Sequence, residues 1–345
     1  MTRGLDVINI ACIGSGAWGR NLVRTFASLP DCRLLYCCDV DPKVLEQASR
    51  TYSDCKATAS LAEVLADEEV DAVVLATPAK LHYEHARAAL VAGKHVFVEK
   101  PMALSANDAQ DLIELVGKSD LKLMVGHLLL YHPAVARLKA LIQSGDLGDI
   151  YYIYSQRTNL GRIRSDESAL WSFAPHDLSV AMYLLDQEPV RISADGQAYL
   201  QPGIEDVVFL TLHFADGKMA HIQVSWLDPH KVRRLTVVGS KKMVLFDDVE
   251  TMEKLKIYDK GAKLPSYDSY GDSITLRFGD IHSPRIDVKE PLRIECEHFV
   301  NCVKTGATPL TDASDGLRVV KALEKADEAL KRRRPTSAGV HLLFL

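Results

Sequence analysis

The sequence predicts an α/β chain in which a helix-covered parallel sheet is followed by an α+β domain with a mostly antiparallel sheet. Over residues 1–125, short apolar runs alternate with amphipathic stretches, as they do in parallel sheets covered on both faces. After about residue 150, strand-like runs follow one another and are joined by turn sequences. We therefore expect domains at 1–125 and 126–345, and leave open whether the last helices pack back on the first domain.

The elements of the first domain alternate along the chain. The expected strands are 8–13, 33–38, 72–76, 95–98 and 121–125, and the expected helices are 18–29, 42–52, 82–92 and 105–116. In the second domain the expected strands are 151–156, 190–199, 207–214, 218–226, 233–238 and 243–246, and the expected helices are 292–304 and 314–332. The polar and aromatic segment 261–285 is expected to be irregular.

Composition limits the classes of function. The chain has 345 residues, of which 47% are hydrophobic and 25% charged, as in ordinary globular proteins. No apolar run reaches the ~18 residues of a membrane helix, and the N-terminus lacks signal-peptide order, so we expect a cytoplasmic protein without membrane contact. A net charge of −5 disfavours nucleic-acid binding. None of the seven cysteines forms a CxxC pair, and we expect reduced core residues and no metal site.

A glycine-rich turn follows the first expected strand and opens a helix. Gly14, Gly16 and Gly19 fit the G-x-G-x-x-G pattern of dinucleotide-binding domains, with Ala17 and Trp18 in the same turn. The three glycines permit the tight turn, the close approach of a pyrophosphate and the packing of helix on sheet, respectively. The helix N-terminus would then face the phosphates. The alternative is a strand-to-helix turn that binds nothing.

Two further strand ends carry charged residues. Asp39 closes the second expected strand, where a carboxylate can bind ribose hydroxyls and would repel a 2′-phosphate, so we expect NAD and not NADP. The alternative is a solvated turn aspartate. Glu99-Lys100-Pro101 closes the expected strand at 95–98, at the edge where ligands bind, and Lys100 could hydrogen-bond a substrate hydroxyl. The alternative is a surface lysine. A proline here is also a candidate for a cis peptide bond.

These residues resemble the glucose–fructose oxidoreductase and inositol dehydrogenase (Gfo/Idh/MocA) superfamily over nearly the whole chain. The resemblance also rests on Ala76-Thr77-Pro78 with His82, on Gly126-His127, and on Trp171-Ser172-Phe173-Ala174-Pro175-His176-Asp177. It implies a Rossmann domain followed by a domain with an open, mostly antiparallel sheet. It also implies that Thr77, Pro78, His82 and Glu99 join the cofactor site, and that Lys100 and His176 act on an alcohol.

One position departs from the family pattern. The family usually has an aspartate four residues before the histidine, and this chain has Ser172. Serine does not titrate near neutral pH, so base duty is expected to fall on His176, with Lys100 assisting and Asp177 orienting the ring. The alternative for His176, taken by itself, is a packing histidine.

A basic segment precedes this motif and bears on the substrate. Arg157, Asn159, Arg162 and Arg164 could bind a diphosphate, and Trp171 could stack on a sugar or base; the alternative is a solvated basic loop. The segment resembles the branch that oxidises C3 of UDP-N-acetylhexosamines. That branch implies UDP-N-acetylglucosamine as the substrate and an aminotransferase as the next enzyme in cell-envelope sugar synthesis. The corresponding uronate, a polyol, or a regulatory NAD-binding role without catalysis remain as alternatives. An uncovered sheet face further predicts a homodimer or homotetramer.

Overall fold

The computed structural model describes residues 7–161, 163–263, 274–287 and 289–333. The chain divides into two compact units, of which the first contains residues 1–145, 178–186 and 284–321, and the second contains 146–177, 187–283 and 322–345. The helices α7 (Ala169–Leu185) and α9 (Ala313–Arg333) each contribute residues to both units. The units therefore alternate along the chain.

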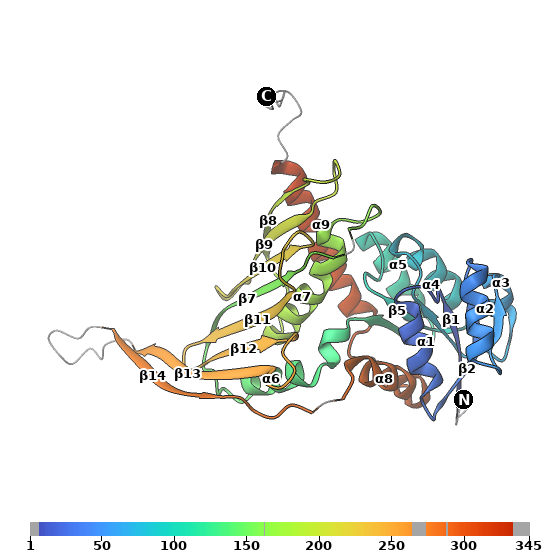
Figure 1. Cartoon of the computed structure of the whole chain (residues 1–345), viewed down its shortest axis with the longest axis horizontal. Helices are drawn as coiled ribbons and strands as arrows, with labels where there is room; N and C mark the ends of the chain where they lie inside the picture. Colours follow the sequence, from blue (N-terminus) through green and yellow to red (C-terminus); the bar gives the residue numbers. More distant parts are fainter. Residues whose placement is uncertain (1–6, 162, 264–273, 288, 334–345) are drawn as a thin grey trace. The chain divides into compact units, whose positions relative to one another are not determined.

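A six-stranded parallel sheet forms the centre of the first unit, in the order β3-β2-β1-β4-β5-β6 (Figure 1). Its strands are β1 (Ile8–Ile13), β2 (Cys32–Cys38), β3 (Lys56–Thr58), β4 (Ala72–Leu75), β5 (His95–Glu99) and β6 (Leu123–Gly126). The strand order reverses between β1 and β4, which is where an open parallel sheet places its ligand. The predicted strands are confirmed, and the short β3 is an addition.

Several helices of the first unit begin at a residue whose side chain caps the helix. The helices that lie within this unit are α1 (Gly19–Ala27), α2 (Pro42–Thr51), α3 (Leu61–Ala66), α4 (His82–Val91), α5 (Ala106–Val116), α6 (Pro133–Gln143) and α8 (Pro291–Thr305), with 3₁₀ turns η1 (Ala79–Leu81) and η2 (Leu128–Tyr131). The side chain of Asp41 accepts a hydrogen bond from the N–H of Lys43, and Ser60 and Ser105 cap α3 and α5 in the same way. The sequence analysis did not predict α3 or α6.

Three phenylalanines fix α1 and α8 against strand β5. The ring centroids of Phe26 and Phe97 lie 5.9 Å apart, those of Phe97 and Phe299 lie 5.7 Å apart, and each pair meets edge to face. All seven cysteines are free and buried, as expected for small core residues. None of the helices in the described ranges is long and apolar enough to cross a bilayer.

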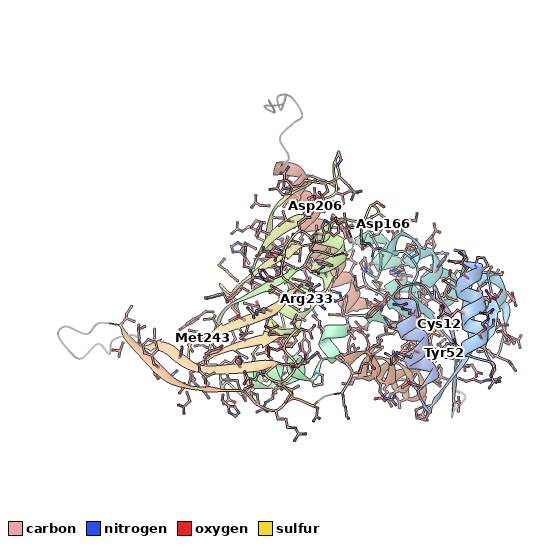
Figure 2. The ribbon with its side chains drawn as sticks, viewed as in Figure 1. Cys12, Tyr52, Asp166, Asp206, Arg233 and Met243 are labelled. Carbon is pink, nitrogen blue, oxygen red and sulfur yellow. The ribbon has the colours of Figure 1, made fainter. Side chains whose placement is uncertain are left out.

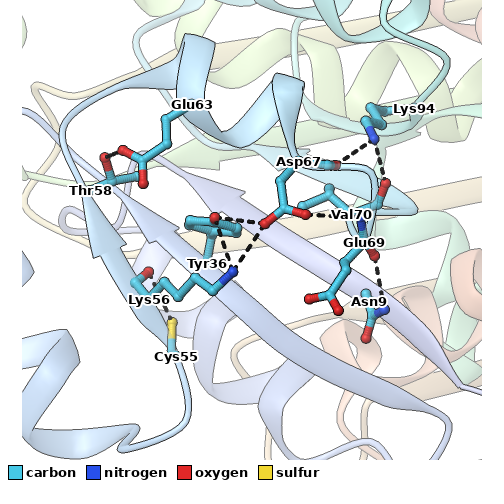
Figure 3. Close-up of polar contacts among 10 residues, drawn as sticks. All are labelled: Asn9, Tyr36, Cys55, Lys56, Thr58, Glu63, Asp67, Glu69, Val70 and Lys94. Atoms are coloured by element: carbon cyan, nitrogen blue, oxygen red, sulfur yellow. Dashed lines mark hydrogen bonds and ion pairs between the residues drawn. The ribbon is translucent and has the colours of Figure 1, made fainter.

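A polar network joins the outer strands β2 and β3 to the turn before β4 (Figure 3). The hydroxyl of Tyr36 donates to Asp67 over 2.8 Å, and the ammonium of Lys56 contacts the same carboxylate at 3.1 Å. Hydrogen bonding by Tyr36, then by the N–H of Glu69, lowers the pKa of Asp67 to about 2. Lys94 donates to the carbonyls of Asp67 and Val70, so one turn receives contacts from β2, from β3 and from the residue that precedes β5.

An eight-stranded sheet forms the second unit, in the order β14-β13-β12-β11-β7-β10-β9-β8. Its strands are β7 (Ile150–Thr158), β8 (Arg191–Gln197), β9 (Val207–His213), β10 (Met219–Ser225), β11 (Val232–Gly239), β12 (Met243–Asp247), β13 (Leu255–Lys263) and β14 (Thr275–His282). All neighbouring pairs are antiparallel except β7 and β10, which confirms a mostly antiparallel sheet. The prediction that segment 261–285 is irregular is wrong, because the described residues of this segment form most of the β13–β14 ladder.

Candidate active site

The glycine-rich loop has the shape that a dinucleotide phosphate requires. Gly14 has φ +86°, and a Cβ there would lie 2.8 Å from the backbone of Ala76. A Cβ on Gly19 would lie 1.8 Å from the carbonyl oxygen of Gly14, so α1 packs directly on the loop. At Gly16 a Cβ would meet nothing within 4 Å, which leaves open space where a pyrophosphate approaches the backbone. The residues present therefore fit an NAD cofactor.

Substitutions at Gly16 and Gly19 should cause different defects. Gly16→Ala should leave the melting temperature close to that of the wild type and weaken NAD binding, because its methyl group enters open space beside the loop. Gly19→Ala should destabilise the protein, because its methyl group collides with backbone. Thermal unfolding and calorimetric titration with NAD measure the two effects separately. Equal NAD affinity in Gly16→Ala and the wild type would contradict this assignment of the loop.

Asp39 follows β2 and is half-buried beside the loop. One oxygen of its carboxylate accepts the N–H of Ser15 at 2.7 Å, and the other accepts the N–H of Asp41 at 2.9 Å. Each oxygen keeps a second lone pair. The aspartate thus holds the loop in place and retains acceptors for ribose hydroxyls.

Trp18 links the loop to the end of β5. Its indole N–H donates to Oε1 of Glu99 over 2.5 Å, and Oε2 of Glu99 accepts the N–H of Lys100 at 3.3 Å. Burial raises the pKa of the Glu99 carboxyl, and the hydrogen bond from Trp18 opposes that rise. The Lys100–Pro101 bond is cis, as expected. Glu99 is therefore a buried support of the loop, at the strand end that carries Lys100.

His82 connects two loops at the carboxyl edge of the sheet. Its ring nitrogens lie 2.7 Å from the carbonyl oxygen of Pro101 and 2.8 Å from that of Thr77, and the ring is 1% exposed. Burial is the largest influence and lowers the pKa of His82, against the two carbonyls. Both ring nitrogens face backbone carbonyl oxygens, of which a neutral imidazole can donate to one, so His82 links the Thr77-Pro78 turn to Pro101.

The second unit carries the predicted base on α7. His176 is half-buried there, and Asp177, the next residue, is 2% exposed. Asp177 accepts hydrogen bonds from Nε of Arg157 at 2.6 Å and from the hydroxyl of Ser155 at 2.6 Å. Successive helix residues point about 100° apart, so Asp177 turns toward the sheet, where Ser155 and Arg157 contact it.

Arg157 is buried, which corrects its expected place as an exposed phosphate ligand. Alternation along β7 turns Ser155 and Arg157 to the covered face and leaves Tyr152 and Tyr154 exposed. The guanidinium of Arg157 forms a two-point contact with the carboxylate of Asp177, with side chains 9% and 3% exposed. Arg157 is therefore a structural partner of the helix that carries His176.

Arg233 is a residue that the sequence analysis did not identify. Figure 2 labels Arg233 in the second unit. It lies on β11 directly opposite Arg157, and like charges at facing positions repel. Its guanidinium donates to the carbonyl of Thr158 at 2.8 Å and to the amide oxygen of Asn159 at 2.5 Å, and lies 5.2 Å from the centre of the Phe173 ring. Burial first, and then Arg157, lowers the pKa of Arg233 to about 10, despite the carboxylates of Asp177 and Asp248. The arginine remains cationic near neutral pH.

The other predicted substrate ligands differ in their burial and in their hydrogen-bond partners. Asn159 supports Arg233, and Trp171 is half-buried on α7. Arg164 is 35% exposed and pairs with Glu167 at 2.7 Å. Arg162 lies outside the described residues. The contact that would have revealed Arg233 is the pairing of β7 with β11, which no local pattern in the sequence discloses.

Comparisons with known proteins agree with this arrangement. One family model, described as an oxidoreductase family with an NAD-binding Rossmann fold, matches residues 8–127, and the GFO/IDH/MocA C-terminal domain matches residues 135–245. The chain is 28% identical to 2,7-anhydro-N-acetylneuraminate hydratase of Escherichia coli (strain K12), over 73% of this chain and 70% of that protein. It is 27% identical to scyllo-inositol 2-dehydrogenase (NAD(+)) of Bacillus subtilis (strain 168), over 90% of this chain and 92% of that protein.

A solved structure extends the likeness to both units. It is UDP-N-acetylglucosamine 3-dehydrogenase from Acidithiobacillus ferrooxidans, with a TM-score of 0.79 and 25% identity over 94% of this chain and 98% of that one. These relatives differ in their reactions and substrates at similar identity, so the likeness gives the family and not the substrate. The glycine-rich loop, the two sheets and both family models lead to one conclusion: this chain belongs to the Gfo/Idh/MocA oxidoreductase family and begins with an NAD-binding Rossmann domain.

Proposed function

We propose that the protein uses NAD to oxidise the C3 hydroxyl of a UDP-N-acetylhexosamine, with UDP-N-acetylglucosamine as the leading substrate. The observation that carries the proposal is Arg233, a half-buried arginine that faces Arg157 across the β7–β11 pairing and lies against Phe173 of the helix that carries His176. Asp177 is used by Arg157, and burial first, then the charge of Arg157, lowers the pKa of Arg233 in spite of Asp177 and Asp248. A diphosphate would supply compensating negative charge, whereas a neutral polyol would not.

Each catalytic residue has a distinct part in this proposal. NAD, when bound, accepts the hydride from the carbon. His176 takes the hydroxyl proton, and Lys100 hydrogen-bonds the reacting oxygen and stabilises its developing negative charge. The product is a 3-keto sugar nucleotide, which an aminotransferase of a cytoplasmic pathway for cell-envelope sugars would consume.

A coupled assay tests the substrate. Alcohol oxidation by NAD is usually uphill near neutral pH, so the ketone must be removed by an aminotransferase with an amino donor. UDP-N-acetylglucosamine should then yield a 3-amino sugar nucleotide, detected by mass spectrometry. UDP-N-acetylglucosaminuronate and scyllo-inositol are the comparison substrates. If only one of those is oxidised, the named substrate is wrong and the dehydrogenase class remains; if none is oxidised, a regulatory NAD-binding role is favoured.

The cofactor preference is a separate prediction. Asp39→Asn removes the charge that repels a 2′-phosphate and keeps an acceptor for the N–H of Ser15. The ratio of NADP to NAD affinity should rise about tenfold or more, since removing a like-charge contact is worth at least ~1.4 kcal/mol. Titration of both cofactors measures the ratio. A wild-type protein that binds NADP more tightly than NAD would contradict the prediction.

The second unit also predicts self-association. One face of its sheet exposes Tyr152, Tyr154 and Phe209 at 43%, 42% and 41%, and such aromatic surface is typical of an interface. We expect a homodimer or homotetramer formed through this face. Light scattering at micromolar concentration should give a multiple of the 38.2 kDa chain mass, and Tyr154→Asp should lower it. A monomeric wild type would remove the idea.

A further inference from the structure

Glu295 on α8 is a buried carboxyl group that the proposed reaction does not use. Its side chain is 0% exposed, and neither carboxyl oxygen has a hydrogen-bond partner among the described residues. An ionised carboxylate in such a place is strongly destabilised, so the group takes up a proton instead. Burial, and then the charge of Glu99, raises the pKa of Glu295 well above its ordinary value.

The packing of α8 on β5 brings the two carboxyl groups together. Glu295 precedes Phe299 by four residues and so lies on the same face of the helix. Glu99 follows Phe97 by two residues and lies on the same face of the sheet. The Phe97 and Phe299 rings are 5.7 Å apart, so this contact places both glutamates in one layer, in agreement with the effect of Glu99 on Glu295.

Few other charges can compensate this pair. Glu99 receives the Trp18 hydrogen bond, and this bond, Lys100 and His127 oppose the rise that burial causes in the pKa of Glu99. His127 contacts Asp315 through Nδ1 at 2.7 Å, while its Nε2 is buried with no partner among the described residues. Three other buried titratable side chains belong to this region. Tyr131 and Cys296 interact with Glu295, and Cys12 interacts with Cys296. Burial raises the pKa of all three side chains, so they stay neutral near pH 7.

The end of β5 belongs to the half of the sheet that receives the nicotinamide of a dinucleotide. The oxidised ring carries a positive charge, and the reduced ring is neutral. We propose that the Glu99–Glu295 pair is a charge sensor for the redox state of the cofactor, which gives up a proton when NAD⁺ binds and keeps it when NADH binds. The balance is protein–H + NAD⁺ → protein·NAD⁺ + H⁺, with no change in total charge.

The sign of the pH effect follows from this balance. A proton is released on binding, so NAD⁺ affinity rises with pH while the pair still holds its proton in the free protein, by up to tenfold per pH unit for one proton. The affinity for NADH should be flat over the same range. Adenine, ribose and pyrophosphate are common to both cofactors, so the difference between them isolates the charge of the ring.

Isothermal titration calorimetry of the full chain tests the proposal without any sugar. NAD⁺ and NADH are titrated in buffers of different ionisation enthalpy, which gives the number of protons released with each cofactor. We expect a fraction of a proton up to one for NAD⁺ and close to none for NADH. Equal release with the two cofactors in the wild-type protein would overturn the proposal, whatever the behaviour of any variant.

Two variants on one helix locate the source of the proton. Glu295→Gln should lose the difference between the cofactors. Glu297→Gln should keep it, because Glu297 is 50% exposed and pairs with Arg293 at the surface of α8. A difference that persists in Glu295→Gln would also overturn the proposal. The inference depends on NAD binding and not on the sugar, so a silent coupled assay would leave it standing.

Discussion

Replacement of His176 by asparagine should lower the turnover number about 10²–10⁴-fold, which is the usual effect of losing a general base. Asparagine keeps a polar group of similar size, so NAD affinity and the melting temperature should change little. Single-turnover formation of NADH, in the presence of the substrate that the coupled assay identifies, measures the chemical step. Ser172, four residues before His176, supplies no carboxylate to share the proton.

A second histidine provides the matched control. His230 lies in the same unit with its side chain 82% exposed, and His230→Asn should leave the turnover number unchanged. Introducing the carboxylate that the family usually has, by Ser172→Asp, should shift the pH profile of turnover if His176 is the base. Full turnover in His176→Asn would show that another group takes the proton.

Removal of one partner of the buried ion pair in the second unit should be strongly destabilising. Arg157→Met leaves the Asp177 carboxylate 2% exposed, with the hydroxyl of Ser155 as a remaining side-chain donor among the described residues. Breaking such a pair costs about 3–5 kcal/mol. Urea unfolding followed by tryptophan fluorescence should detect the loss, because Trp226 is fully buried in the same unit.

The double variant separates charge from packing. Arg157→Met combined with Asp177→Leu removes both charges and should recover much of the stability, because neither charge is then left alone in the interior. Arg164→Met is the matched control, since that ion pair is part-exposed and such pairs contribute about 0–1 kcal/mol. A loss no larger in Arg157→Met than in Arg164→Met would contradict the assignment.

The sequence predicted the features that depend on local pattern. Apolar strands, the glycine-rich turn and the strand-end residues Asp39 and Glu99 could be predicted because each depends on neighbours in the chain. The face that a residue occupies was harder to predict: Arg157 looked like a surface cation until alternation along β7 and the carboxylate of Asp177 placed it inside.

Contacts between distant segments could not be predicted from the sequence. The hydrogen-bond partners of Arg233, Thr158 and Asn159, are 75 and 74 residues away in the sequence, and the pairing of β7 with β11 brings them together. Glu295 is a charged residue in a predicted helix, and its burial depends on the packing of α8 against β5, where Phe299 contacts Phe97. The described part of the 261–285 segment is extended because β13 and β14 pair with each other, although its composition suggested no strand.

The alternation of the two units along the chain has a consequence for biosynthesis. The NAD-binding unit is completed by residues 284–321, so α8 and Phe299 emerge from the ribosome only after the whole eight-stranded sheet has been translated. Until then the Phe97 side of β5 has Phe26 of α1 against it but lacks the part of its cover that α8 supplies, and this part remains a hydrophobic surface for chaperones to recognise. A chain truncated near residue 145 would expose the same surface permanently. The cofactor-binding unit is therefore completed only after the eight strands of the second unit have been translated, even though its first strand is translated first.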